Sequence, residues 1–90
     1  MIKLSDDIAK LVESDNIEAA IDKISEILEK EVSADAYYYR GRLYWRLGNK
    51  SRAISDYCHA VELNPESEAR EALKMATSIM DFYNKEIYNP

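Results

Sequence analysis

The sequence predicts an all-α protein in which antiparallel helix–turn–helix pairs stack, with about five helices in its 90 residues. Only two glycines and two prolines are present, too few for the many turns of an all-β protein. Apolar residues instead recur at the three- and four-residue intervals of amphipathic helices, and one such pattern returns after 33 residues. A chain of this length is expected to form one domain.

Capping and helix-breaking residues set the expected ends of the helices. Asn16, Ser33 and Asn49 are each suited to accept hydrogen bonds from the free amides at a helix start. Gly48 suits the left-handed conformation just past a helix end, and Pro65 prevents the preceding helix from continuing. Together with the apolar spacing, these signals predict helices over residues 3–14, 17–30, 34–47, 51–63 and 67–84.

The second and fourth of these helices repeat one apolar pattern. Ala20, Ile21, Ile24, Ile27 and Leu28 correspond to Ala53, Ile54, Tyr57, Ala60 and Val61 at a constant shift of 33 residues. Because a helix pair cannot bury its apolar face alone, neighbouring pairs must stack. The fifth helix then closes the stack with an apolar face formed by Ala69, Ala72, Leu73, Ala76, Ile79, Met80 and Tyr83.

Charge is unevenly distributed along the chain. The net charge is −5, and residues 1–33 alone carry −5, whereas residues 34–50 carry +3. An acidic total argues against general nucleic-acid affinity, because phosphate binding depends on clustered Lys and Arg. The basic segment is still compatible with a local anionic partner.

Cysteine content and hydropathy indicate the compartment. The single cysteine, Cys58, allows no internal disulfide, and a reducing compartment is the simpler interpretation. The first residues turn acidic before any apolar run of signal-peptide length, and no apolar run reaches the roughly 18 residues of a membrane span. We therefore expect a cytoplasmic protein that does not enter the membrane.

The segment from Tyr37 to Gly48 gathers five of the nine aromatic residues and three arginines. With the residues that follow, it resembles a tetratricopeptide repeat. Nine residues across 34–67 stand at the signature spacing of that family: Tyr37, Gly41, Leu43, Tyr44, Gly48, Ala53, Tyr57, Ala60 and Pro65. The resemblance implies a single domain over 1–90, with a degenerate repeat at 1–33, a full repeat at 34–67, and a capping helix and tail at 68–90.

Two implications of the resemblance concern packing. Arg40 would pair with Asp56 across two antiparallel helices, since an unpaired buried charge is costly; the alternative is that Arg40 reaches solvent along its aliphatic stem. In the first repeat, Asp15 stands where glycine is usual. Either Ile8 or, with the register shifted by one residue, Ala9 takes the place of the small residue at the helix crossing.

The resemblance also implies a function as an adaptor or scaffold, because the first helix of each tetratricopeptide pair lines a concave face where partner peptides bind. The residues at those positions, here called the aromatic–arginine face, are Tyr38, Tyr39, Arg42, Trp45 and Arg46. Tyr, Trp and Arg are enriched at binding hot spots and Arg binds carboxylates, so we expect an acidic or C-terminal peptide segment. The alternative is structural: Tyr38 and Trp45 pack on helices one and five, and the arginines are solvated.

Two other kinds of binding are alternatives. The run from Ile79 to Tyr88 is more apolar than a capping helix requires, so it could form a homodimer, or the tail 82–90 could fold back over the groove. Single-stranded nucleic acid could stack on Tyr38, Tyr39 and Trp45, although the acidic surroundings disfavour it.

We expect no catalysis, metal or cofactor. Cys58 and His59 are adjacent and point about 100° apart on a helix, so they form neither a nucleophile–base pair nor a metal site. Both glycines are explained by packing and capping, which leaves none for a phosphate-binding loop. The Lys, Asn and Arg set with which some family members grip a chaperone's terminal carboxylate is also missing, since Tyr39, Ala69 and Leu73 stand at three of its positions.

Overall fold

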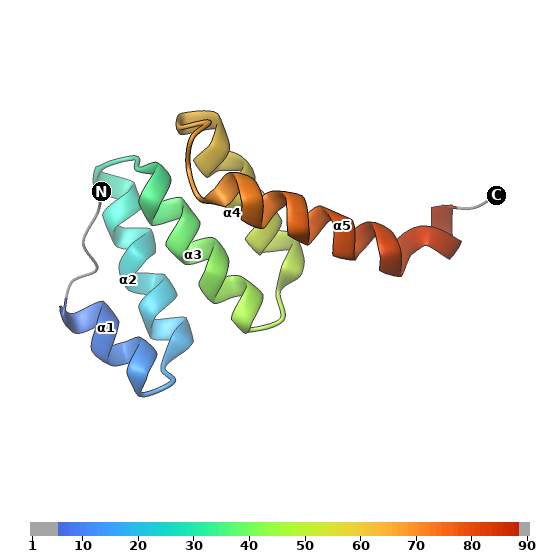
Figure 1. Cartoon of the computed structure of the whole chain (residues 1–90). Helices are drawn as coiled ribbons and strands as arrows, with labels where there is room; N and C mark the ends of the chain where they lie inside the picture. The colour runs from blue at the N-terminus through green and yellow to red at the C-terminus, as the bar shows by residue number, and fades with distance from the viewer. Residues whose placement is uncertain (1–5, 89–90) are drawn as a thin grey trace.

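The computed structural model describes the backbone of residues 6–88 and the side chains of residues 6–78. Within that range the chain is all-α, without a strand, and its helices are α1 (Asp6–Glu13), α2 (Ile17–Lys30), α3 (Ala34–Arg46), α4 (Lys50–Leu63) and α5 (Ala69–Tyr88). Helices α1 and α2 form one antiparallel hairpin, and α3 and α4 form a second that stacks beside it (Figure 1). Helix α5 packs on α4 and extends beyond the other helices.

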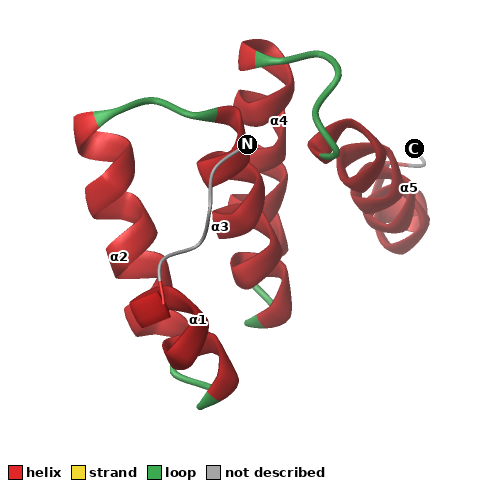
Figure 2. Ribbon diagram, turned by 60° about the vertical axis from the view of Figure 1, so that its left-hand side comes forward, coloured by secondary structure: helices red, strands yellow, loops and turns green. Residues whose placement is uncertain are grey.

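The helix bounds agree with the sequence-based expectation to within one residue for α2, α3 and α4. Helix α5 differs: it begins two residues later than expected and continues to Tyr88. It begins late because the Ser67 hydroxyl accepts from the Ala69 amide at 3.1 Å, in the longer loop that joins α4 to α5 (Figure 2). It continues because no glycine or proline interrupts it before Pro90. The expected contribution of Leu4 to the first helix lies outside the described residues.

Two of the three expected caps are confirmed and one is wrong. The Ser33 hydroxyl accepts from the Ala36 amide, and the Asn49 side chain accepts from the Arg52 amide, both at 3.3 Å. Asn16 precedes α2 but accepts no capping hydrogen bond. Its side-chain Nδ2 instead donates to the Ser14 hydroxyl at 3.0 Å, which holds the side chain against the preceding turn.

The first repeat replaces a glycine with an aspartate at its turn. Asp15 adopts φ 64°, in the left-handed region, as Gly48 does at φ 86° in the corresponding turn of the second repeat. Aspartate tolerates this conformation better than most residues, so the turn closes in the same way. Ile8 is 2% exposed whereas Ala9 is only half-buried, so Ile8 takes the buried place at the helix crossing.

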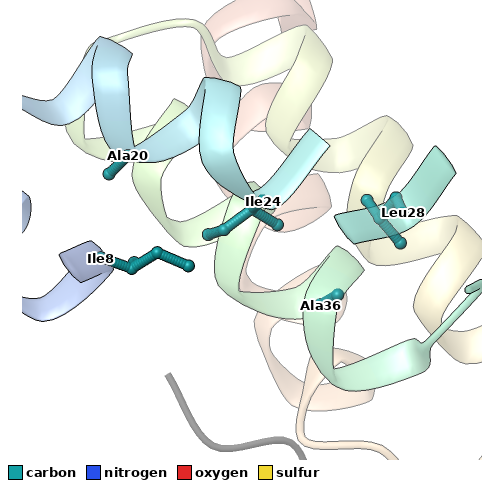
Figure 3. Close-up of a cluster of buried hydrophobic side chains, with 5 residues drawn as sticks. All are labelled: Ile8, Ala20, Ile24, Leu28 and Ala36. Carbon is teal, nitrogen blue, oxygen red and sulfur yellow. The ribbon is translucent and has the colours of Figure 1, made fainter. Parts of the chain in front are cut away.

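The core consists of two clusters along the stack. The first joins α1, α2 and the start of α3 through Ile8, Ala20, Ile24, Leu28 and Ala36, with Ile8 pointing toward α2 (Figure 3). The second joins α4 and α5 through Ala53, Tyr57, Ala60, Ala69 and Ala76. The expected apolar faces of these helices are buried or half-buried where their side chains are described. Ile79, Met80 and Tyr83 lie outside the residues whose side chains are described. Helix α3 lies between the two clusters, and its aromatic residues pack against both.

Candidate functional site

Helix α3 is held against its neighbours by a two-pronged ion pair. The Arg40 guanidinium donates to both carboxylate oxygens of Asp56 on α4, each at 2.8 Å. It also donates from Nη1 to the Ser25 hydroxyl on α2 at 3.0 Å, so it ties three helices together. The hydrogen bond to Asp56 raises the pKa of Arg40 above its ordinary value. The pairing expected from the family resemblance is present, whereas Ser25 was not predicted, because an isolated exposed-looking serine carries no sequence signal.

The five residues of the aromatic–arginine face lie on α3 but differ in exposure. Arg42 and Arg46 are exposed, whereas Tyr38, Tyr39 and Trp45 are half-buried. The Tyr38 ring lies 5.8 Å from the Tyr39 ring and 6.1 Å from the Tyr57 ring of α4, measured between centroids. The aromatic residues therefore help to build the core while the arginines extend from it into solvent.

Two cations lie over aromatic rings at this surface. The Arg42 guanidinium carbon is 5.7 Å from the centre of the Tyr38 ring, and the Lys50 Nζ is 5.1 Å from the centre of the Trp45 ring. Cation–π contacts of this kind limit the motion of long side chains at modest energy. Lys50 belongs to the basic segment 34–50 but was not predicted as part of the site. Its positive charge next to the aromatic residues could have indicated it.

A first pocket of about 180 Å³ opens between α1, α2 and α3. Its walls are mainly apolar and carry two guanidiniums: the lining residues are Ile8, Val12, Ile24, Tyr39, Arg42, Leu43 and Arg46. A partner could place an apolar side chain in this pocket and a carboxylate on the arginines. The α1 and α2 residues were expected only as core, because nothing in the spacing of a buried helix face reveals an unfilled space.

A second pocket of about 170 Å³ lies on the other side of α3, between α3, α4 and α5. It is lined by Trp45, Tyr57, Ala72, Met75 and Ala76. Met75 is 66% exposed, which is high for a large apolar side chain. Trp45 therefore packs toward α5, which agrees with the alternative that its role is structural. It also forms part of the wall of an open pocket.

The ion pair between Arg46 and Asp15 is weak and would compete little with a bound carboxylate. Arg46 Nη2 lies 3.4 Å from Asp15 Oδ1, and the two side chains are 53% and 80% exposed. Ion pairs exposed to this degree contribute little, because water and salt screen them and two long side chains must be ordered. A partner carboxylate could replace Asp15 at little cost.

Burial raises the pKa of Tyr57 above its ordinary value of 10.0, and the neighbouring Tyr38 adds to the effect. Well below pH 10 the tyrosine is protonated in both the folded and the unfolded chain. As the pH rises, the unfolded chain loses the proton first, because its Tyr57 pKa is the lower of the two. The free energy of unfolding therefore falls. We expect it to fall more steeply between about pH 9 and about pH 11 in the wild type than in Tyr57→Phe, measured by urea unfolding. Parallel curves for the two proteins would show that Tyr57 does not contribute.

Reactive side chains, metal ligands and membrane-spanning helices are the other features that could carry a function in the described part of the chain. His59 packs against Tyr37, with ring centroids 5.0 Å apart, and Cys58 is a half-buried free thiol. In the described residues, no group of three or more His, Cys, Asp or Glu side chains could hold a metal ion. None of the described helices combines the length and the apolar character needed to cross a bilayer.

Comparison with known proteins agrees with this architecture. The tetratricopeptide repeat model matches residues 34–67, the helices α3 and α4 with the turn that follows. The solution NMR structure of Bacteroides fragilis protein BF1650 is similar, with a TM-score of 0.82 and 40% identity, over 99% of this chain and 91% of that one. No curated protein matches. Members of the repeat family are typically non-enzymatic modules for protein–protein interaction. The chain belongs to the tetratricopeptide repeat family.

Proposed function

We propose that this protein is an adaptor that binds an acidic peptide segment of a partner protein across the aromatic–arginine face of α3. The observation that carries the proposal is the first pocket, where apolar walls from three helices meet the exposed guanidiniums of Arg42 and Arg46. In this proposal residues 1–90 act as one module: a degenerate repeat at 1–33, a full repeat at 34–67, and a capping segment at 68–90.

The charge at this face supports an acidic partner. Arg42 contacts a tyrosine ring and Arg46 lies beside an exposed aspartate, so both guanidiniums are available to a carboxylate. Lys50 adds a third positive charge beside Trp45. Arginine binds a carboxylate through two parallel hydrogen bonds, which gives an acidic side chain or a terminal carboxylate a defined orientation.

The rigidity of α3 supports the same function. The Arg40–Asp56 pair, the Ser33 cap and the turn at Gly48 fix the helix at its middle and at both ends. The half-buried aromatic rings pack against the two core clusters, which restricts their motion. A surface fixed in this way loses little conformational entropy when a partner binds, which favours affinity.

The test is a selection of peptides from a random phage-displayed library against the wild-type protein, followed by affinity measurement on the enriched sequences. We expect enriched peptides to contain Asp or Glu. The double variant Arg42→Glu, Arg46→Glu is expected to bind them at least about tenfold more weakly, because charge-assisted hydrogen bonds contribute about 1.5–3 kcal/mol each. Both residues are exposed, so the fold should be retained.

The matched control is Lys23→Glu, Arg52→Glu, which makes the same change in net charge on α2 and α4. Both residues are exposed and neither lines the first pocket. The control should bind like the wild type. If the two double variants bind equally well, or if no acidic peptide is enriched, the aromatic–arginine face is not the binding surface.

A further inference from the structure

From the two pockets that flank α3, we infer the pattern of side chains that the partner peptide carries: two apolar residues with an acidic residue between them. This inference rests on the proposed function, since it specifies the peptide that the aromatic–arginine face accepts. The charge of the face does not reveal where the peptide's apolar residues bind, because part of each pocket wall comes from other helices.

Helix geometry places Arg42 at the edge of the first pocket that faces the second pocket. On α3 the first pocket is lined by Tyr39, Arg42, Leu43 and Arg46, and the second by Trp45. At about 100° per residue, Arg42 lies on the surface of α3 between Arg46 on one side and Trp45 on the other. A peptide that crosses α3 from one pocket to the other therefore passes over the Arg42 guanidinium.

The two pockets have similar sizes, about 180 and 170 Å³, and both have mainly apolar walls. Each is wide enough for one apolar side chain and too small for a folded element. The exposed Met75 side chain forms one wall of the second pocket, and methionine adapts its shape to different apolar partners. Arg42 and Arg46 line the first pocket and complement one or two carboxylates, and Lys50 adds a positive charge over the Trp45 ring.

The width of α3 sets the spacing of the two apolar residues. A helix with its side chains is about 10–12 Å across, and an extended peptide advances about 3.3–3.6 Å per residue. The second apolar residue is therefore three or four positions after the first, with two or three residues between them. The occupant is a short extended segment of another protein, with its acidic residue inside this interval.

The test uses synthetic peptides in which two leucines flank a spacer containing one aspartate, with spacers of one to six residues. Affinity for the wild-type protein should be highest with two or three spacer residues. Replacing either leucine by serine in that peptide should weaken binding about tenfold or more, because a buried leucine loses its apolar contacts. Equal affinity for all spacers, or for the leucine and serine peptides, would overturn the inference.

Protein variants assign each leucine to its pocket. Met75→Gln keeps the shape of an exposed side chain but removes an apolar wall of the second pocket, so it should abolish the advantage of only one leucine. Lys74→Gln, at an exposed neighbouring position that does not line the pocket, is the control and should bind like the wild type. Loss of the advantage of both leucines in Met75→Gln, or of neither, would contradict the assignment.

The outcomes separate this inference from the proposed function. If aspartate peptides bind and lose affinity with Arg42→Glu, Arg46→Glu, but the leucines have no effect, the acidic site stands and the two-pocket pattern fails. If none of the peptides binds, both fail. Sedimentation completes the test: a wild-type dimer that dissociates on adding the leucine peptide would make a second copy of this chain the occupant, and would overturn the assignment to a separate partner.

Discussion

Replacing Asp56 with alanine is expected to lower the free energy of unfolding by about 3–5 kcal/mol, since it leaves a partly buried guanidinium without its charged partner. The Asp56 side chain is 4% exposed and that of Arg40 20%, so neither group can exchange the pair for full hydration. Alanine also removes both acceptors that orient Arg40 at 2.8 Å, and only the Ser25 hydroxyl would remain. Denaturant unfolding followed by circular dichroism measures the loss.

A double-mutant cycle separates the interaction from the cost of burial. Arg40→Leu alone leaves the Asp56 carboxylate buried and unpaired, and Asp56→Leu alone leaves the Arg40 guanidinium unpaired. Each should destabilise the protein at least as much as Asp56→Ala. The double variant Arg40→Leu, Asp56→Leu leaves no charge in the interface, and such replacements are often nearly neutral. Asp56→Asn, which keeps the shape and an acceptor oxygen, should fall between the wild type and Asp56→Ala. A loss below about 1 kcal/mol for Asp56→Ala would reduce this pair to the value of a surface ion pair.

Gly41→Ala is expected to destabilise the protein by about 1–3 kcal/mol, even though alanine favours a helix interior by about 1 kcal/mol over glycine. An added Cβ would lie 2.7 Å from Cε1 and 2.8 Å from Cδ1 of Tyr57, and 3.2 Å from the Ala53 carbonyl oxygen. Tyr57 is 5% exposed and packed in the second core cluster, so its ring cannot move aside freely. Helices α3 and α4 would have to separate.

The cause of this loss can be tested by changing the other partner. With Tyr57→Val, the ring atoms nearest to the added Cβ are gone, so Gly41→Ala should cost less in that background than in the wild type. Gly48→Ala is the control for a backbone effect: its added Cβ meets nothing within 4 Å, and its cost comes from the left-handed φ of 86°. The cost of Gly48→Ala should therefore be the same in the wild-type and the Tyr57→Val backgrounds. An equal cost of Gly41→Ala in both backgrounds would exclude the clash with Tyr57.

The two repeats show how this crossing is filled in different ways. Under the 33-residue shift, Ile8 corresponds to Gly41 and Ile24 to Tyr57. In the second repeat Gly41, which has no side chain, faces Tyr57. In the first repeat Ile8 faces Ile24, and both are 2% exposed. A large residue on one helix is matched by a glycine on the other in the second repeat, whereas two residues of middle size share the space in the first. This explains how a degenerate first repeat still packs.

The sequence by itself determined the helices and their order. Helix ends follow from local interactions, so Ser33, Gly48 and Asn49 indicated their turns correctly, and the repeated apolar spacing indicated which faces are buried. The same local logic failed at Asn16, whose side chain donates to the Ser14 hydroxyl and accepts no capping hydrogen bond. The family resemblance supplied the Arg40–Asp56 pair.

Only the tertiary structure decided how the aromatic–arginine face is divided. The sequence left open whether these residues pack or face solvent. Tyr38 and Trp45 are half-buried against the second core cluster and Tyr39 against the first, whereas Arg42 and Arg46 are exposed. The two pockets likewise arise from side chains on helices far apart in the chain. Spacing within a helix predicts which side of it is apolar, but the space left between helices depends on the side chains that each neighbour contributes.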